Sequence, residues 1–98
     1  MTEAVLLGIL VQAERYGRDI AREYKKRTGR EIPVGSLYVT LDRMERSGLI
    51  SSRMGVKAEE LGGNRRQYFR IRAAGHRAFD MACRAMTLQV EVGGGPTW

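Results

Sequence analysis

The residues of this chain that could carry chemistry are mainly arginines and lysines, and they gather in two stretches. Seven basic residues fall between positions 15 and 30, where the acids are Asp19 and Glu23, and five fall between positions 65 and 77 with no acid among them. Guanidinium and ammonium groups bind phosphate oxygens, so such clusters are typical of surfaces that contact nucleic acid. The net charge of +6, from 17 basic and 11 acidic residues, agrees with a polyanionic partner. Basic side chains that are merely solvated are the alternative.

Other kinds of chemistry find little support in the sequence. His76 is the only histidine, and neither a serine, cysteine and histidine set nor a carboxylate pair is spaced for nucleophilic or acid–base catalysis. Cys83 is the only cysteine, which excludes an internal disulfide, and its apolar helical surroundings predict a buried structural thiol. One histidine and one cysteine do not make a metal site. We therefore expect no enzyme, no metal and no cofactor.

The sequence also lacks membrane and export signals. No apolar run reaches the roughly 18 residues that a membrane span needs. Thr2 and Glu3 stand before the first apolar run, where a signal peptide would carry basic residues. We expect a cytoplasmic protein that makes no membrane contact.

A short helix over residues 33–48 is the element most suited to reading DNA. Its apolar stripe must face a core and consists of Val34, Leu37, Leu41 and Met44. The opposite face is small at its first turn and basic in its last two turns, and it carries Gly35, Ser36, Val39, Asp42, Arg43 and Arg46. Pro33 suits a helix start and Gly48 suits the position after a helix end. A helix that is slim at its start fits a DNA major groove, although the same pattern also occurs on ordinary surface helices.

The elements around this helix complete a small domain. Residues 2–14 predict an almost wholly apolar helix, which must be central in the core or covered by another subunit. A second helix is predicted over residues 18–28, closed by Gly29, and the following short connection makes a helix-turn-helix with residues 33–48. Residues 49–54 and 67–72 predict two strands of a β-hairpin. The predicted fold is mainly α with a small β-hairpin wing: a winged helix-turn-helix over residues 1–72.

A last helix is predicted from residue 73 to about residue 91, followed by a loose tail over residues 93–98. Its apolar residues recur three and four positions apart, as in a coiled-coil seam. We interpret residues 73–92 as a dimerisation helix, with packing onto its own domain as the alternative. The expected subunit interface contains Leu6 and Leu10 of the first helix with Ala78, Met81, Ala82, Ala85, Leu88 and Val92.

Several of these motifs, in unbroken order over about residues 4–80, resemble the PadR family of bacterial transcription regulators. They are YG at 16–17, GSLY at 35–38 with Leu41, RME at 43–45, SGLI at 47–50, GNRRQYFRI at 63–71 and Gly75. The resemblance implies a homodimeric winged helix that binds a pseudo-palindromic operator on double-stranded DNA, usually as a repressor. It also implies a small-molecule effector in many members, for which the space between paired last helices, lined by Met81, Cys83, Met86 and Trp98, is the expected place.

The sequence departs from the family pattern at three points. Val39 replaces the family's proline after the helix tyrosine, and Arg72 replaces a threonine that would cap the last helix. The chain ends soon after one C-terminal helix, so it resembles the short subfamily without a longer helical effector domain.

The expected DNA contacts divide into three groups. Ser36 and Val39 should approach base edges, Val39 through a thymine methyl group, while Tyr38 and Arg43 should hold phosphates or a guanine. Asn64, Arg65 and Arg66 should grip a phosphate or a minor-groove edge from the wing. The other expected contacts are Tyr16, Arg18, Arg22, Lys25, Gly35, Thr40 and Arg46. A winged helix that binds protein, or one that binds nucleic acid without sequence preference, is the alternative function.

Overall fold

The computed structural model describes residues 2–55 and 66–88, and it confirms a mainly helical chain with a small sheet. The elements, in chain order, are α1 (Thr2–Gln12), β1 (Arg15–Tyr16), α2 (Gly17–Thr28), α3 (Val34–Arg46), β2 (Ile50–Met54), β3 (Gln67–Ile71) and α4 (Ala73–Leu88). The helices therefore lie within two residues of their predicted starts. Within the described ranges, no helix has the length and apolar character that crossing a membrane would require.

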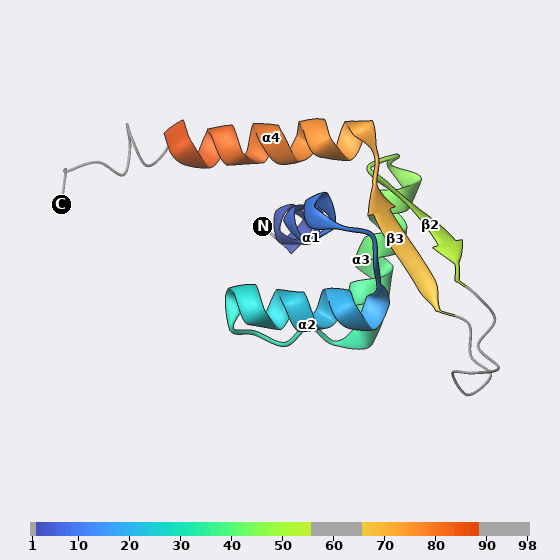
Figure 1. The fold of residues 1–98 in the computed structure, drawn as a ribbon. Helices are drawn as coiled ribbons and strands as arrows, with labels where there is room; N and C mark the ends of the chain where they lie inside the picture. The colour runs from blue at the N-terminus through green and yellow to red at the C-terminus, as the bar shows by residue number, and fades with distance from the viewer. Residues whose placement is uncertain (1, 56–65, 89–98) are drawn as a thin grey trace.

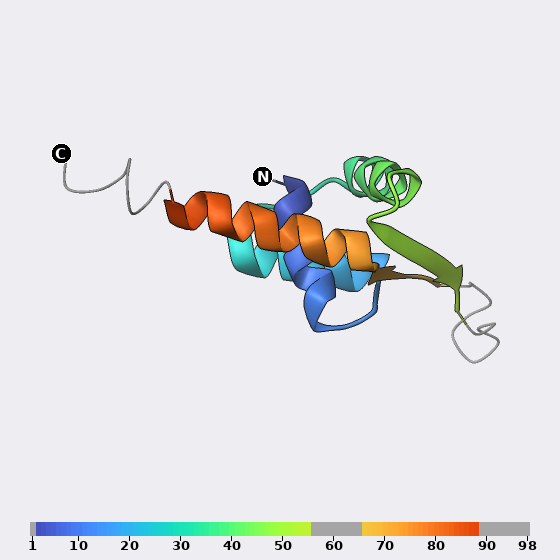
Figure 2. The same ribbon diagram turned by 90° about the horizontal axis from the view of Figure 1, so that it is seen from above.

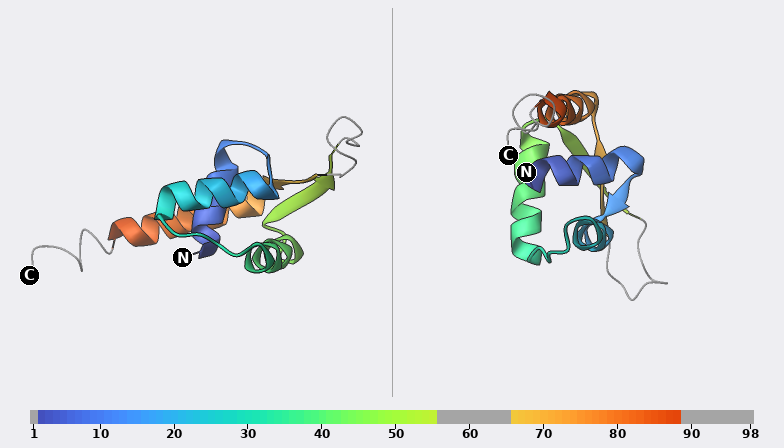
Figure 3. Two further views of the ribbon diagram at one scale, coloured as in Figure 1. Left: turned by 90° about the horizontal axis from the view of Figure 1, so that it is seen from below. Right: turned by 90° about the vertical axis from the view of Figure 1, so that its left-hand side faces the viewer.

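Helix α1 occupies the centre of the molecule. It passes between α4 and α2, with its first turn beside α3 (Figures 1 and 3). Leu6, Leu7, Ile9 and Leu10 are all buried in the core of the subunit. Leu6 and Leu10 were expected in a subunit interface, but both side chains are already covered within the subunit and leave little surface for a partner. The almost wholly apolar sequence of α1 is thus explained by burial on several sides within its own chain.

Helices α2 and α3 pack on α1 as a helix-turn-helix. Leu37, Leu41 and Met44 of α3 are buried, as the apolar stripe predicts. Val34 is 66% exposed, so the prediction that it faces the core is wrong. It lies in the first turn of α3, which extends beyond the edge of the core. Gly48 has a φ of +80°, which confirms its predicted place just after the helix end.

The sheet has three antiparallel strands in the order β1-β3-β2, one more than the predicted hairpin. Strand β1 pairs Tyr16 with Tyr68 and Arg15 with Phe69. The sequence indicated only a break between two helices at this point, since two residues are too few to show an alternating pattern. Strand β1 therefore joins the α1–α2 connection to the wing.

Helix α4 leaves the sheet and runs back across α1, beyond which its C-terminal end projects (Figure 2). Phe79 lies against Gly8 of α1, where an added Cβ would stand 3.0 Å from the ring. Cys83 is exposed, so the predicted burial of its thiol is wrong: it lines an open groove between α4 and α1. The predicted interface residue Val92 and the tail over residues 93–98 lie outside the described residues.

Candidate nucleic-acid interface

The first turns of α3 present a slim, exposed surface. Nothing lies within 4 Å of the place where a Cβ on Gly35 would stand, and Ser36 is exposed beside it. Val39, one turn further on, is 64% exposed. The Thr40 hydroxyl donates to the backbone oxygen of Ser36 at 2.9 Å, so this hydroxyl is already hydrogen-bonded within the helix. Glycine, serine and valine thus form the part of α3 that can approach another molecule most closely.

Tyr38 marks the junction between α2 and α3. Its hydroxyl lies so close to Gly17 that a Cβ at that position would overlap it. Its ring is tilted against Phe69 of β3, with ring centroids 6.1 Å apart. Tyr38 is nevertheless partly exposed, so it can position α3 and still present an edge to a ligand.

Most of the cations expected to contact DNA are paired with acids in the structure. Arg22 Nη1 lies 2.9 Å from Asp19 Oδ1, and Lys25 Nζ lies 3.7 Å from Glu31 Oε2. On α3, the side chain of Arg46 pairs with Asp42 at 2.5 Å and that of Arg43 with Glu3 at 3.1 Å. Arg18 is exposed and has no ion pair within the described ranges. These cations are exposed, but much of their charge is compensated by the paired acids before any ligand binds.

The inner face of the sheet ties the wing to α3. Ser52 of β2 donates its hydroxyl to the Glu45 carboxylate, 2.9 Å from each oxygen. Gln67 of β3 in turn donates its amide N–H to the Ser52 hydroxyl at 3.1 Å. These bonds connect both wing strands to α3, so the angle between the wing and α3 is fixed by side chains as well as by the backbone.

The outer face of the sheet carries a stack of aromatic and basic side chains. The rings of Tyr16 and Tyr68 meet edge to face, with centroids 5.9 Å apart. The guanidinium of Arg66 lies 4.4 Å from the centre of the Tyr16 ring, and that of Arg53 lies 4.9 Å from the Tyr68 ring. Cations over aromatic faces are attracted by the ring quadrupole, so this stack holds β1 against the wing.

Glu14 anchors the stack at its base. Arg53 donates from Nε and Nη2 to the two Glu14 oxygens, at 3.0 and 2.8 Å. These hydrogen bonds hold the pKa of the Glu14 carboxyl below its ordinary value. The pair is therefore fully charged at neutral pH and fixes Arg53 over the tyrosine ring.

A Tyr16→Leu substitution is expected to lower the free energy of unfolding by about 1–2 kcal/mol, because it removes one ring–ring and one cation–ring contact. Tyr16→Phe is the matched control and should stay close to the unaltered chain, since both contacts use the ring rather than the hydroxyl. Urea unfolding followed by circular dichroism measures both variants. Equal losses in the two variants would contradict the role given to the ring.

The structure brings together only part of the predicted site. The α3 residues share one surface, whereas Tyr16 and Arg66 are engaged with each other on the outer face of the sheet. Asn64 and Arg65 lie outside the described residues. Sequence reasoning did not predict the wing contacts made by six residues: Glu14, Glu45, Ser52, Arg53, Gln67 and Tyr68. Strand alternation could have placed Arg53 and Tyr68 on one face, but their partners come from distant segments.

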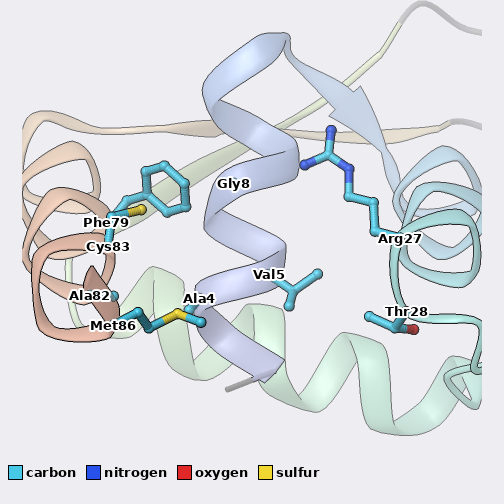
Figure 4. Close-up of a pocket in the computed structure, with 9 residues that line it drawn as sticks. All are labelled: Ala4, Val5, Gly8, Arg27, Thr28, Phe79, Ala82, Cys83 and Met86. Atoms are coloured by element: carbon cyan, nitrogen blue, oxygen red, sulfur yellow. The ribbon is translucent and has the colours of Figure 1, made fainter. Parts of the chain in front are cut away.

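A separate apolar groove of about 240 Å³ lies where α4 and the end of α2 flank α1 (Figure 4). Phe79, Cys83 and Met86 line it from α4, facing Ala4, Val5 and Gly8 of α1, and the remaining lining residues are Arg27, Thr28 and Ala82. Two residues of the expected effector space, Cys83 and Met86, are thus in the groove, while Met81 is not among its lining residues. The described ranges contain no cluster of three or more potential metal ligands.

Comparisons with known proteins agree on one family and one fold. Residues 6–81 match the family model described as the transcriptional regulator PadR-like family. No curated protein matches the chain. A PadR family transcription regulator from Clostridium difficile R20291 has 26% identity and a TM-score of 0.81, over 92% of this chain and 91% of that one. A transcriptional regulator from Clostridium thermocellum has 24% identity and a TM-score of 0.80, over 98% and 92% of the two chains.

A third similar structure contains nucleic acid. The Bacillus subtilis PadR protein in complex with operator DNA has 19% identity and a TM-score of 0.72. The match covers 84% of this chain and 45% of that one. At this identity the likeness concerns the fold.

Proposed function

Because the chain belongs to the PadR-like family of transcriptional regulators, we propose that it binds a pseudo-palindromic operator as a homodimer and represses transcription there. The observation that carries the proposal is the exposed, uncluttered start of α3. Gly35, Ser36 and Val39 leave this helix narrow enough to enter a major groove, where hydroxyl and methyl groups can meet base edges. The Bacillus subtilis PadR structure with operator DNA supports this use of the same fold.

Phosphate contacts come from the cations on both sides of α3. Arg18 at the start of α2 is exposed and has no acidic partner within the described ranges, so it can meet a phosphate without first leaving an ion pair. Arg22, Lys25, Arg43 and Arg46 exchange their acidic partners for phosphates when DNA binds. In this proposal Asn64, Arg65 and Arg66 flank the site from the wing.

The dimer uses the face of α4 that its own subunit leaves open. Met81 is 70% exposed and Ala85 is exposed one turn further on, while Phe79 on the neighbouring stripe packs against α1. The C-terminal end of α4 projects beyond α1 (Figure 2). Exposed apolar side chains in a row mark an interface, and a second copy of α4 is the partner that the family suggests. Twofold symmetry then sets two α3 helices about one DNA turn, 34–36 Å, apart.

Selection of bound sequences from a random duplex pool with the purified protein tests the proposal. We expect inverted half-sites with centres about 10–10.5 base pairs apart. Arg18→Ala should reduce the log–log salt slope of binding by about 0.9, the value for one lost phosphate contact. Arg70→Ala is the control, because Arg70 is exposed next to buried Phe69 and so points away from the α3 side of the sheet.

Two other outcomes favour the alternatives. Salt-sensitive binding without an enriched sequence would indicate a non-specific nucleic-acid-binding module. Absence of DNA binding at low salt would favour a winged helix that binds protein, for which Val34 and Val39 offer an exposed apolar start. Repression itself is tested with a reporter gene behind the selected operator, whose expression should fall when the protein is produced.

A further inference from the structure

The ion pair between Arg43 and Glu3 links the recognition helix to a distant part of the chain. Arg43 Nε donates to Glu3 Oε2 at 3.1 Å, across 40 positions of sequence. Arg22 and Arg46 pair with acids of their own helices, and Lys25 pairs with Glu31 of the short α2–α3 connection. Among the cations expected to contact DNA that lie in the described ranges, Arg43 is therefore the one whose acidic partner comes from another helix.

The geometry puts the Glu3 carboxylate on the side of the molecule that faces DNA in the proposed function. Glu3 lies in the first turn of α1, and Figure 3 shows this end of α1 beside α3. The side chains of Arg43 and Glu3 are 61% and 42% exposed, so water and ions reach both. The following residues, Ala4 and Val5, line the α1–α4 groove. Glu3 thus sits between the recognition surface and the apolar groove.

We propose that Glu3 sets the DNA affinity of this chain by competing with DNA for Arg43. An exposed ion pair contributes little to stability, so Arg43 can leave Glu3 readily when a phosphate or a guanine edge is offered. Its departure breaks the ion pair with Glu3, so the energy of that pair is subtracted from the energy that Arg43 gains on DNA. The energy of this ion pair is lost at every DNA sequence that Arg43 contacts. Glu3 therefore lowers the DNA affinity of the chain through Arg43. The inference rests on the proposed function, because it requires α3 to meet DNA.

Fluorescence anisotropy with the selected operator tests the competition. Glu3→Gln is expected to bind about two- to fivefold more tightly at low salt, the range given by the energy of an exposed ion pair. In an Arg43→Gln background, the same Glu3→Gln change should alter affinity by less than about 1.5-fold, because the competed group is gone. Asp80→Asn is the charge-matched control: it removes one acid from an exposed position of α4 and should leave affinity within about 1.5-fold.

The outcomes separate this inference from the proposed function. Unchanged affinity in Glu3→Gln would overturn the competition while leaving operator binding intact. An equal gain with and without Arg43 would also overturn it, since Glu3 would then act only by general repulsion. Failure of the unaltered chain to bind any selected duplex would instead overturn the proposed function. Circular dichroism of Glu3→Gln should match the unaltered chain, because neither side chain of the pair is buried.

Discussion

A Met81→Glu variant is expected to be monomeric at micromolar concentration and to bind the operator at least about 100-fold more weakly than the unaltered chain. Met81 is the most exposed large apolar side chain of the described residues, and it stands on the open stripe of α4. A carboxylate there would have to be buried without a partner in the proposed interface, which is strongly unfavourable. Two linked half-site contacts gain about 10²–10⁴ in affinity over one, so a monomer loses that factor.

Sedimentation velocity and operator anisotropy measure the two effects separately. Met54→Glu is the matched control for assembly: Met54 is also an exposed methionine, at 51%, but it lies at the end of β2, away from α4. This variant should remain dimeric. A dimeric Met81→Glu protein, or a monomer of about 11 kDa that keeps full operator affinity, would contradict the dimer placed on α4.

A Gly75→Ala variant is expected to lose about 1–3 kcal/mol of unfolding free energy, the usual effect of an overpacked core position. A Cβ on Gly75 would overlap the backbone oxygen of Leu49 and stand 2.7 Å from Cγ1 of Ile71. A backbone oxygen cannot rotate away as a side chain can, so α4 would have to shift from the sheet. Alanine normally stabilises a helix relative to glycine by about 1 kcal/mol. A lower unfolding free energy in Gly75→Ala would therefore be due to the close contact of the added Cβ with Leu49 and Ile71.

Gly35→Ala is the matched control, because Gly35 also lies in the first turn of a helix. Nothing lies within 4 Å of its added Cβ, so the substitution should leave stability equal or slightly higher. Urea unfolding followed by circular dichroism compares the two variants directly. A Gly75→Ala protein as stable as the unaltered chain would show that α4 does not need this close approach.

The elements of the fold were predictable where a long apolar period exists. Leu37, Leu41 and Met44 recur at helical spacing, and the structure buries all three. Val34 continues the same period but is exposed, because periodicity gives the face of a residue and not the depth of the core at that turn. The burial of Cys83 was mispredicted for a related reason: an apolar face predicts that a neighbouring element lies against it, but not how closely that element covers each side chain.

The candidate site was predictable only for residues carried by one helix. Ser36, Val39 and Arg43 follow from the pattern of α3 itself. Arg43 pairs with Glu3, and Ser52 pairs with Glu45. Neither pairing can be recognised from the spacing of residues along one helix or strand. Strand β1 was missed for the same reason, since two residues become a strand only through pairing with β3.

Strand β1 also affects the order in which the domain can fold. Its pairing with β3 closes a loop that runs from Tyr16 to Tyr68 and contains α2, α3 and β2. Contacts between such distant positions carry the largest loop-closure entropy, so they form after the helices inside the loop have shortened it. A chain emerging from the ribosome can therefore assemble its helix-turn-helix first, and it gains a correctly seated wing only once residue 68 has been made.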